Sequence, residues 1–304
     1  MHTSNSTVNR KKEQFPDNVL IYYRYFCWFK FLAIIIVNTF VFVVIISKRK
    51  LRSQRNNKLF MALLFSHFSN GVWNIIEAVL VNITKQGGIH TFAATGTIRY
   101  WFSSLFLLVW AAVFVNMILV VFDRFLAIRY PYLYQRLKAR TFLLSALCAC
   151  VVAIALTIFT TNYFGEIPVV VFVCVLSIVF PGILMYAHAS IYYQTRSQFK
   201  KMIKLTVTKD ADDKKKEKRR LLKRQIRSLR ICMLLMASFL ITWIPSATLF
   251  ILQFKGAIGE SILMFGYVII CLNSIADPSI YAWYNHDVKT TLKRIVSKQE
   301  TSAQ

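Results

Sequence analysis

Seven long apolar runs divide this chain, and they constrain its fold more than any other feature. A helix needs about 20 apolar residues to cross a bilayer, and each run is near or above that length. The ten-residue alternation of a membrane β-barrel is absent. We therefore predict an all-α fold, a bundle of seven transmembrane helices. The runs fall at 26–47, 58–82, 97–129, 141–160, 167–195, 222–253 and 260–284.

Basic residues are concentrated in every second connection between these runs. The connection 196–230 alone holds 15 Lys and Arg residues against 4 Asp and Glu residues. Basic connections stay on the cytoplasmic side, which puts the N-terminus outside and the C-terminus in the cytoplasm. Glycosylation sequons at Asn5 and Asn82 both fall on the predicted outer side. The segment 196–230 is a solvated loop, a partner surface, or both.

Composition excludes several classes of protein. The net charge of +25 would suit nucleic acid, but the charges lie between apolar runs, so the bilayer is the expected partner. All six Cys lie in apolar runs, and we expect no disulfide framework. No HExxH, GxSxG or metal-ligand cluster occurs, so we expect no enzyme, no metal and no cofactor. The predicted divisions are an extracellular tail, a membrane domain and a cytoplasmic tail, at 1–25, 26–296 and 297–304.

Two residues of the last run, Asp277 and Pro278 in LNSIADPSIYAWY, are costly in a membrane helix. An ionisable group in hydrocarbon costs about 3 kcal/mol, and an internal proline removes a backbone hydrogen bond and kinks the helix. The third run ends in Asp123 and Arg124, beside a basic connection. Adjacent helix residues do not face each other, so Arg124 can point into the bundle with Asp123 as its counter-charge. A simple interfacial ion pair is the alternative.

Three segments together resemble motifs of the rhodopsin-like (class A) G-protein-coupled receptors. DRFLAIRYPYLY (123–134) is similar to the Asp-Arg-Tyr box, and TWIPS (242–246) to the Cys-Trp-x-Pro box. NSIADPSIY (273–281) is similar to the Asn-Pro-x-x-Tyr box in its Asp-Pro variant. The segment 284–296, apolar at intervals among basic residues, suits a short amphipathic eighth helix on the inner membrane face. The resemblance extends over 26–296.

This resemblance implies a plasma-membrane receptor that activates heterotrimeric G proteins, with arrestin as a further partner. In the family, the arginine at the place of Arg124 meets the G protein once it is freed. Tyr281 swings inward beside the kink at Pro278, which gives a bundle with two arrangements. The coupling and switch residues are then Asp123, Arg124, Phe125, Asp277, Pro278 and Tyr281, and the transmission switch is Phe239, Trp243 and Pro245.

The polar core departs from the family pattern. The family usually has a sodium-binding Asp in its second helix, where this chain has His67, and Asn where it has Asp277. Sodium prefers oxygen ligands, which His67 does not supply. We expect His67 and Asp277 to pair across two helices, with weak or absent sodium regulation and a pH-dependent signal; a neutral, hydrogen-bonded His67 is the alternative. The polar core comprises Asn38, His67, Asn273, Ser274 and Asp277.

The outer side departs from the family as well. Arg99 stands at the place of the Cys that usually bonds the second outer loop, and the connection 160–167 has no Cys. This short connection and the NSIADPSIYA segment are most similar to the melanocortin, lysosphingolipid, cannabinoid and adenosine branch.

The family's ligand site implies a pocket open to the outside. Phe106 occupies the place of the Asp of amine receptors, and Cys271 that of the retinal Lys of opsins, so neither ligand is expected. Glu77 is either an anchor for a cationic ligand or a partner of Arg99. The aromatic residues are alternatively core packing. The predicted wall is Glu77, Phe106, Trp110, Trp243, Tyr267 and Cys271.

Two other functions remain open from the sequence. Transporters usually contain inverted repeats and several paired intramembrane charges, and the sequence shows no repeat. A non-signalling or decoy receptor is compatible with the missing disulfide and the altered polar core. For a signalling receptor, the ligand is a peptide, a lipid or a small molecule.

Overall fold

The structure is a computed structural model, and the residues it describes are 17–84, 96–136, 212–254, 257–258, 260–302 and isolated positions between 144 and 197. For part of these residues only the backbone is described. The spans predicted at 141–160 and 167–195 lie mainly outside the described residues.

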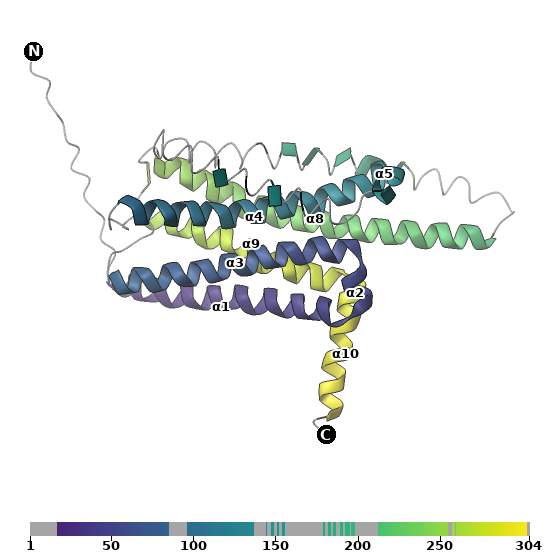
Figure 1. The fold of residues 1–304 in the computed structure, drawn as a ribbon, viewed down its shortest axis with the longest axis horizontal. Coiled ribbons are helices and arrows are strands. Elements are labelled where there is room, and N and C mark those ends of the chain that lie inside the picture. Colours follow the sequence, from purple (N-terminus) through teal and green to yellow (C-terminus); the bar gives the residue numbers. More distant parts are fainter. Residues whose placement is uncertain are drawn as a thin grey trace, which may run out of the picture.

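Every regular element among the described residues is an α-helix, as the apolar runs predict. Five helices are long and three are short (Figure 1). In chain order they are α1 (Asp17–Ser47), α2 (Arg49–Ser53), α3 (Arg55–Thr84), α4 (Gly96–Arg129), α5 (Pro131–Arg136), α8 (Asp212–Phe254), α9 (Glu260–Tyr284) and α10 (His286–Ser302).

Four of the described helices are long and apolar enough to cross a membrane, namely α1, α3, α4 and α8. Their apolar windows are Trp28–Ser47, Arg55–Ile76, Leu108–Ala127 and Arg230–Leu249. The helices α1 and α8 begin well before their windows, because each residue added to a formed helix gains a backbone hydrogen bond. The basic first turns of α8 consequently project past the end of the bundle (Figure 1).

The long helices pack side by side with their polar residues inside. The α8–α9 pair has the most extensive contact, and α3 lies between α1 and α4 (Figure 1). Gly71 permits the close approach of α3 to α1, since a Cβ there would lie 2.9 Å from a side-chain carbon of Ile35. Apolar side chains of α1, such as Ile36 and Phe40, are exposed, whereas Asn38 is fully buried. This inversion suits a helix whose outer face contacts lipid.

The short helices α2, α5 and α10 lie together at one end of the bundle (Figure 1). Asn285 caps α10, because its Oδ1 accepts hydrogen bonds from the backbone N–H groups of Asp287 and Val288 at 3.1 and 3.3 Å. The fully buried Val288 then fixes α10 against the bundle, across the direction of the long helices (Figure 1). The amphipathic eighth helix is therefore present, and it runs to Ser302, beyond residue 296.

Candidate functional site

The carboxylate of Asp277 is the centre of a buried polar cluster that joins three helices. Ser238 Oγ of α8 donates to Asp277 Oδ1 at 2.8 Å, and Asn273 Nδ2 of α9 donates to Oδ2 at 3.2 Å. His67 Nε2 of α3 lies 3.0 Å from the same Oδ2, and both side chains are fully buried. The two residues expected to pair across helices therefore lie in hydrogen-bond contact.

Two donors of the cluster follow from their chemistry. Asn273 Nδ2 and Ser238 Oγ donate to the Asp277 carboxyl group, whereas the role of His67 Nε2 depends on the tautomer of the ring. His67 Nδ1 is buried without a hydrogen-bond partner among the described residues. A protonated ring would neutralise the carboxylate, and a neutral ring would leave Nδ1 as an unpaired acceptor; both are compatible with the contact. In either state the imidazole of His67 supplies no oxygen ligand for sodium at this position.

The remaining members of the predicted polar core lie next to this cluster. Asn38 Nδ2 donates to the backbone oxygens of Ile34 and Ser274, both at 2.8 Å. Asn70 Nδ2 donates to Ser274 Oγ at 3.4 Å. These bonds connect α1, α3 and α9, so all five residues expected to form the polar core are brought together.

Aromatic rings surround Trp243 in α8. Its ring lies 4.0 Å from that of Phe114, 5.1 Å from that of Trp110 and 5.2 Å from that of Phe239, measured between centroids. Trp110, Trp243 and Cys271, which we expect in the pocket wall, are all buried. The side chains of Glu77, Phe106 and Tyr267 lie outside the described residues. Pro245 lies inside α8 and Pro278 inside α9.

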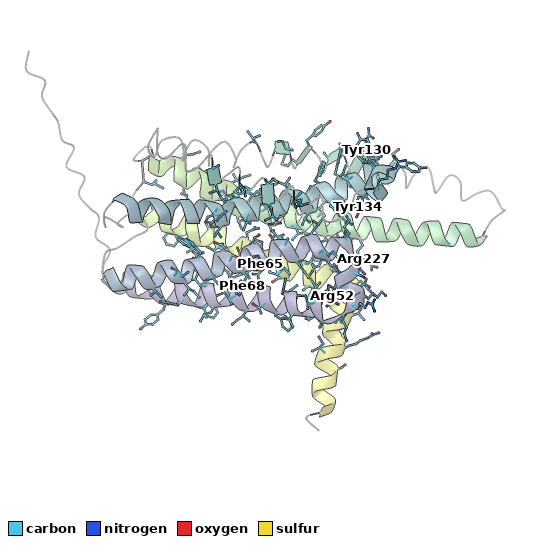
Figure 2. The ribbon with its side chains drawn as sticks, in the orientation of Figure 1. Arg52, Phe65, Phe68, Tyr130, Tyr134 and Arg227 are labelled. Atoms are coloured by element: carbon cyan, nitrogen blue, oxygen red, sulfur yellow. The ribbon has the colours of Figure 1, made fainter. Side chains whose placement is uncertain are left out.

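At the end of the bundle where the short helices lie, Asp123 is shared by two arginines. Arg55 Nε of α3 lies 2.8 Å from Asp123 Oδ1, and Arg124 forms an ion pair with Oδ2. Tyr134 of α5 donates from its hydroxyl to the same Oδ2 at 3.4 Å. Burial raises the pKa of the Tyr134 phenol, so it stays protonated as a donor. Figure 2 shows Tyr134 and Arg227 at this end of the bundle.

Tyr281 is held by α3 through both its hydroxyl group and its ring. Its hydroxyl donates to Asn57 Oδ1, and its ring stacks on Phe60 with centroids 3.5 Å apart. Asn285 Nδ2 reaches the same Asn57 oxygen at 3.5 Å. The predicted switch residues therefore occupy two neighbouring clusters, one around Asp123 and one around Asn57.

Sequence reasoning missed two residues of these clusters and one buried lysine outside them. Ser238 carries no signal in the sequence, because a mid-helix serine usually bonds its own helix. Arg55 lies in a basic connection between two apolar runs, where its charge indicates only the orientation of the chain. Lys30, in the first apolar run, is only 4% exposed and lies over the ring of Phe31 at 4.5 Å. A buried lysine in an apolar run is the signal that could have drawn attention to it.

The described residues thus form a helical membrane bundle with a polar core and a charged cluster at one end. The sequence model of the 7-transmembrane receptor (rhodopsin family) matches residues 37–281, more than half of the 304 residues. The chain belongs to this family, and the resemblance seen in its motifs is confirmed. No curated protein matches the sequence.

A solved structure shows the same fold. The crystal structure of squid rhodopsin aligns with a TM-score of 0.78, covering 97% of this chain and 90% of that chain at 13% identity. Such low identity shows the fold alone. The all-α bundle of seven transmembrane helices is confirmed. The family and fold are those of multi-pass plasma-membrane receptors that signal through G proteins, rather than those of enzymes.

Proposed function

We propose that the protein senses an extracellular ligand and activates heterotrimeric G proteins through Arg124 and the cytoplasmic connections. The observation that carries this proposal is the cluster around Asp123. Arg124 is half-buried at the end of α4 and is held by a carboxylate that also binds Arg55 of α3. Movement of α3 or α5 would change this competition and free the guanidinium, whose exposure would create a contact for a G protein.

The clusters around Asp277 and Asn57 give the proposal a two-state element. In the structure, α9 is tied to α3 at both levels, by His67 and by Asn57. Both hydrogen bonds lie near Pro278, where α9 lacks one backbone hydrogen bond. An agonist would favour an arrangement in which these hydrogen bonds between α9 and α3 are replaced by others.

The proposed ligand site lies between the outer parts of the helices, above Trp243. The proposed wall comprises Trp110 and Cys271 together with Glu77, Phe106 and Tyr267. Glu77 is either the anchor of a cationic ligand or the partner of Arg99, so cationic peptides form the first set of ligands to screen. The proposed orientation has the N-terminus outside and the C-terminus in the cytoplasm, with glycans at Asn5 and Asn82 and arrestin as a second cytoplasmic partner.

The test is basal signalling, measured with a panel of Gα dissociation sensors at matched surface expression. Arg124→Ala is compared with wild type and with Arg129→Ala, a control in the last turn of the same helix that is exposed. We expect Arg124→Ala to abolish basal signalling while Arg129→Ala retains it. Unchanged signalling in Arg124→Ala would contradict the role assigned to this residue.

A non-signalling or decoy receptor is the second candidate. The observation that favours it is the number of ties that hold α9 to α3, together with Arg55 competing with Arg124 for Asp123. A receptor with no signal on any sensor, including after ligand screening, would support this second function.

A further inference from the structure

A lysine is buried in the first membrane helix, at a position that the proposed function does not use. Lys30 lies in the apolar window Trp28–Ser47 of α1, and it is only 4% exposed. It shares one face of α1 with Ile34 and Asn38, which follow at intervals of about one helical turn and are fully buried. The side chain of Lys30 therefore faces the bundle rather than the lipid.

The ammonium group of Lys30 has no acidic partner within the part of the chain that the structure describes. Its Nζ lies 4.5 Å from the centroid of the neighbouring Phe31 ring. Such a cation–π contact contributes about 0.5–2 kcal/mol, whereas a buried charge costs several kcal/mol unless a counter-charge is close. The described surroundings of Lys30 therefore lack the negative charge that a buried ammonium group requires.

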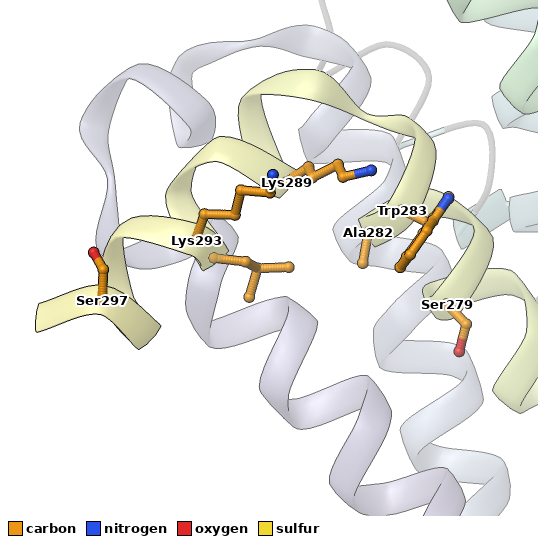
Figure 3. A pocket seen from close by; sticks show the side chains of 7 residues that line it. Ser279, Ala282, Trp283, Lys289, Lys293 and Ser297 are labelled. Atoms are coloured by element: carbon orange, nitrogen blue, oxygen red, sulfur yellow. The ribbon is translucent and has the colours of Figure 1, made fainter. Parts of the chain in front are cut away.

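Lys289 of α10 shows the difference that burial makes. Its Nζ lies 4.2 Å from the centroid of the Trp283 ring, in an arrangement similar to that of Lys30 and Phe31. However, Lys289 is only partly buried and lines an open groove at the junction of α9 and α10 (Figure 3). Water can solvate its ammonium group there, so this group needs no counter-ion. Lys30 has the same kind of contact with almost no access to water.

Helix geometry gives the depth of Lys30 in the bundle. Asn38 Nδ2 donates to the backbone oxygen of Ser274, so these two residues lie at one level of α1 and α9. The two helices run in the same direction (Figure 1). A step of about 12 Å toward their N-terminal ends, at about 1.5 Å per residue, leads from Asn38 to Lys30 and from Ser274 to Gly266. Lys30 and Gly266 are therefore at about the same depth.

This depth corresponds to that of the proposed ligand site. Ser246 Oγ of α8 donates to the Gly266 carbonyl oxygen at 2.9 Å, and Ser246 follows Trp243 by about one helical turn. Lys30 thus lies one turn beyond Trp243, on the α1 side of the bundle. The rings of Phe31 and Trp243 are both buried and supply apolar surface. A ligand at this depth meets an unneutralised cation among apolar side chains.

We propose that Lys30 binds the carboxylate of an extracellular ligand, a small monocarboxylic acid with an apolar body. This inference rests on the proposed function and adds an anion anchor to its ligand site. One carboxylate supplies the single negative charge that one ammonium group requires, and it accepts a charge-assisted hydrogen bond from Nζ. The anchor is compatible with Glu77 as the contact of a cationic group on the same ligand.

The first test needs no ligand and measures the melting temperature of the purified receptor. We expect Lys30→Met to raise it, because an unneutralised buried charge is replaced by an apolar side chain of similar length. Lys289→Met is the matched control, which removes the same group from an open groove and should leave the melting temperature nearly unchanged. An unchanged or lower value for Lys30→Met would mean that another residue, such as Glu77, already neutralises Lys30, and it would overturn the proposal.

The second test measures binding to the same receptor, again without G protein. The probes are phenylpropionate, phenylpropanol and phenylpropylamine, which share one carbon skeleton and differ in charge. We expect phenylpropionate to raise the melting temperature of wild type and Lys289→Met more than the other two probes do. Lys30→Met should bind phenylpropionate about 10- to 100-fold more weakly, the loss expected for a hydrogen bond between charged groups.

Three results of the second test would overturn the anion anchor. They are equal shifts with all three probes, equal binding of phenylpropionate by wild type and Lys30→Met, and no shift of wild type with phenylpropionate. Because no G protein is present in either test, such a failure leaves the proposed signalling function intact, and the comparison of Arg124→Ala with wild type decides that function separately.

Discussion

Asp277 and His67 together distinguish the polar core of this protein from the pattern that the resemblance implies. The family's acid lies in the second helix, and here it lies in α9, with His67 at the family's position. The three groups in hydrogen-bond contact with Asp277 come from α3, α8 and α9 itself.

Sodium should therefore have little effect on this receptor. Thermal stability of the purified wild type should be the same in sodium chloride and in choline chloride, because His67 occupies the place of a sodium ligand. The double variant His67→Asp/Asp277→Asn restores the family's arrangement, and its stability should rise in sodium. A large sodium effect on the wild type would rule out this account of the polar core.

Ser238 should contribute to the stability of the bundle through Asp277. Ser238→Ala removes a donor to a charged acceptor, which costs about 1.5–3 kcal/mol when such a bond is buried. Its melting temperature should fall measurably in a thermal unfolding assay. Ser69→Ala is the control, because among the described residues the hydrogen bond of Ser69 Oγ goes to the Phe65 carbonyl of its own helix. Equal effects of the two substitutions would argue against a special role for Ser238.

At the scale of elements, α9 combines apolar packing along two helices with polar bonds to a third. It packs along α8 and α1, contains Pro278 and, in its last turn, Tyr281, which bonds to Asn57 of α3. A helix that is tied by a few polar bonds beside a proline can shift without loss of its apolar packing.

Asn57→Ala should release Tyr281 and raise basal signalling, because the hydroxyl loses its acceptor on α3. The measurement is Gα dissociation at matched surface expression, on the sensor that responds to wild type. Asn56→Ala is the control on the neighbouring position, which is less buried than Asn57. Lower signalling in Asn57→Ala, with normal expression, would show that this bond supports the active arrangement instead.

For the whole molecule, orientation follows from charge rather than from the fold. Seven helices can cross a bilayer in either direction, and the basic connections decide which end stays in the cytoplasm. The basic start of α8 and the helix α10 lie at the same end of the bundle as Arg124, so a single topology would place all of them on one side (Figure 1).

An epitope tag at each end tests this topology. In intact cells, an antibody should reach the N-terminal tag, and it should reach the C-terminal tag only after permeabilisation. Asn5→Gln should also shift the electrophoretic mobility if this sequon carries a glycan. Labelling of the C-terminal tag in intact cells would contradict the proposed orientation.

The sequence by itself determined the class of fold, the number of spans and the identity of most candidate residues. The length of each apolar run and the uneven distribution of basic residues are local properties of the chain, and they determine how it inserts into a bilayer. The motifs around Arg124, Trp243 and Pro278 are local as well. The family match then confirmed the class without changing it.

Only the tertiary structure decided which polar groups meet. Ser238 donates to Asp277, Arg55 competes for Asp123, and Asn57 holds Tyr281, although each partner is 39 or more residues away in the chain. Hydrogen bonds need atoms within about 3 Å and correctly aimed, a condition that depends on the rotation and depth of each helix in the bundle. The spacing of residues along the chain does not specify which side chains will meet, because their relative positions are set only when the helices pack.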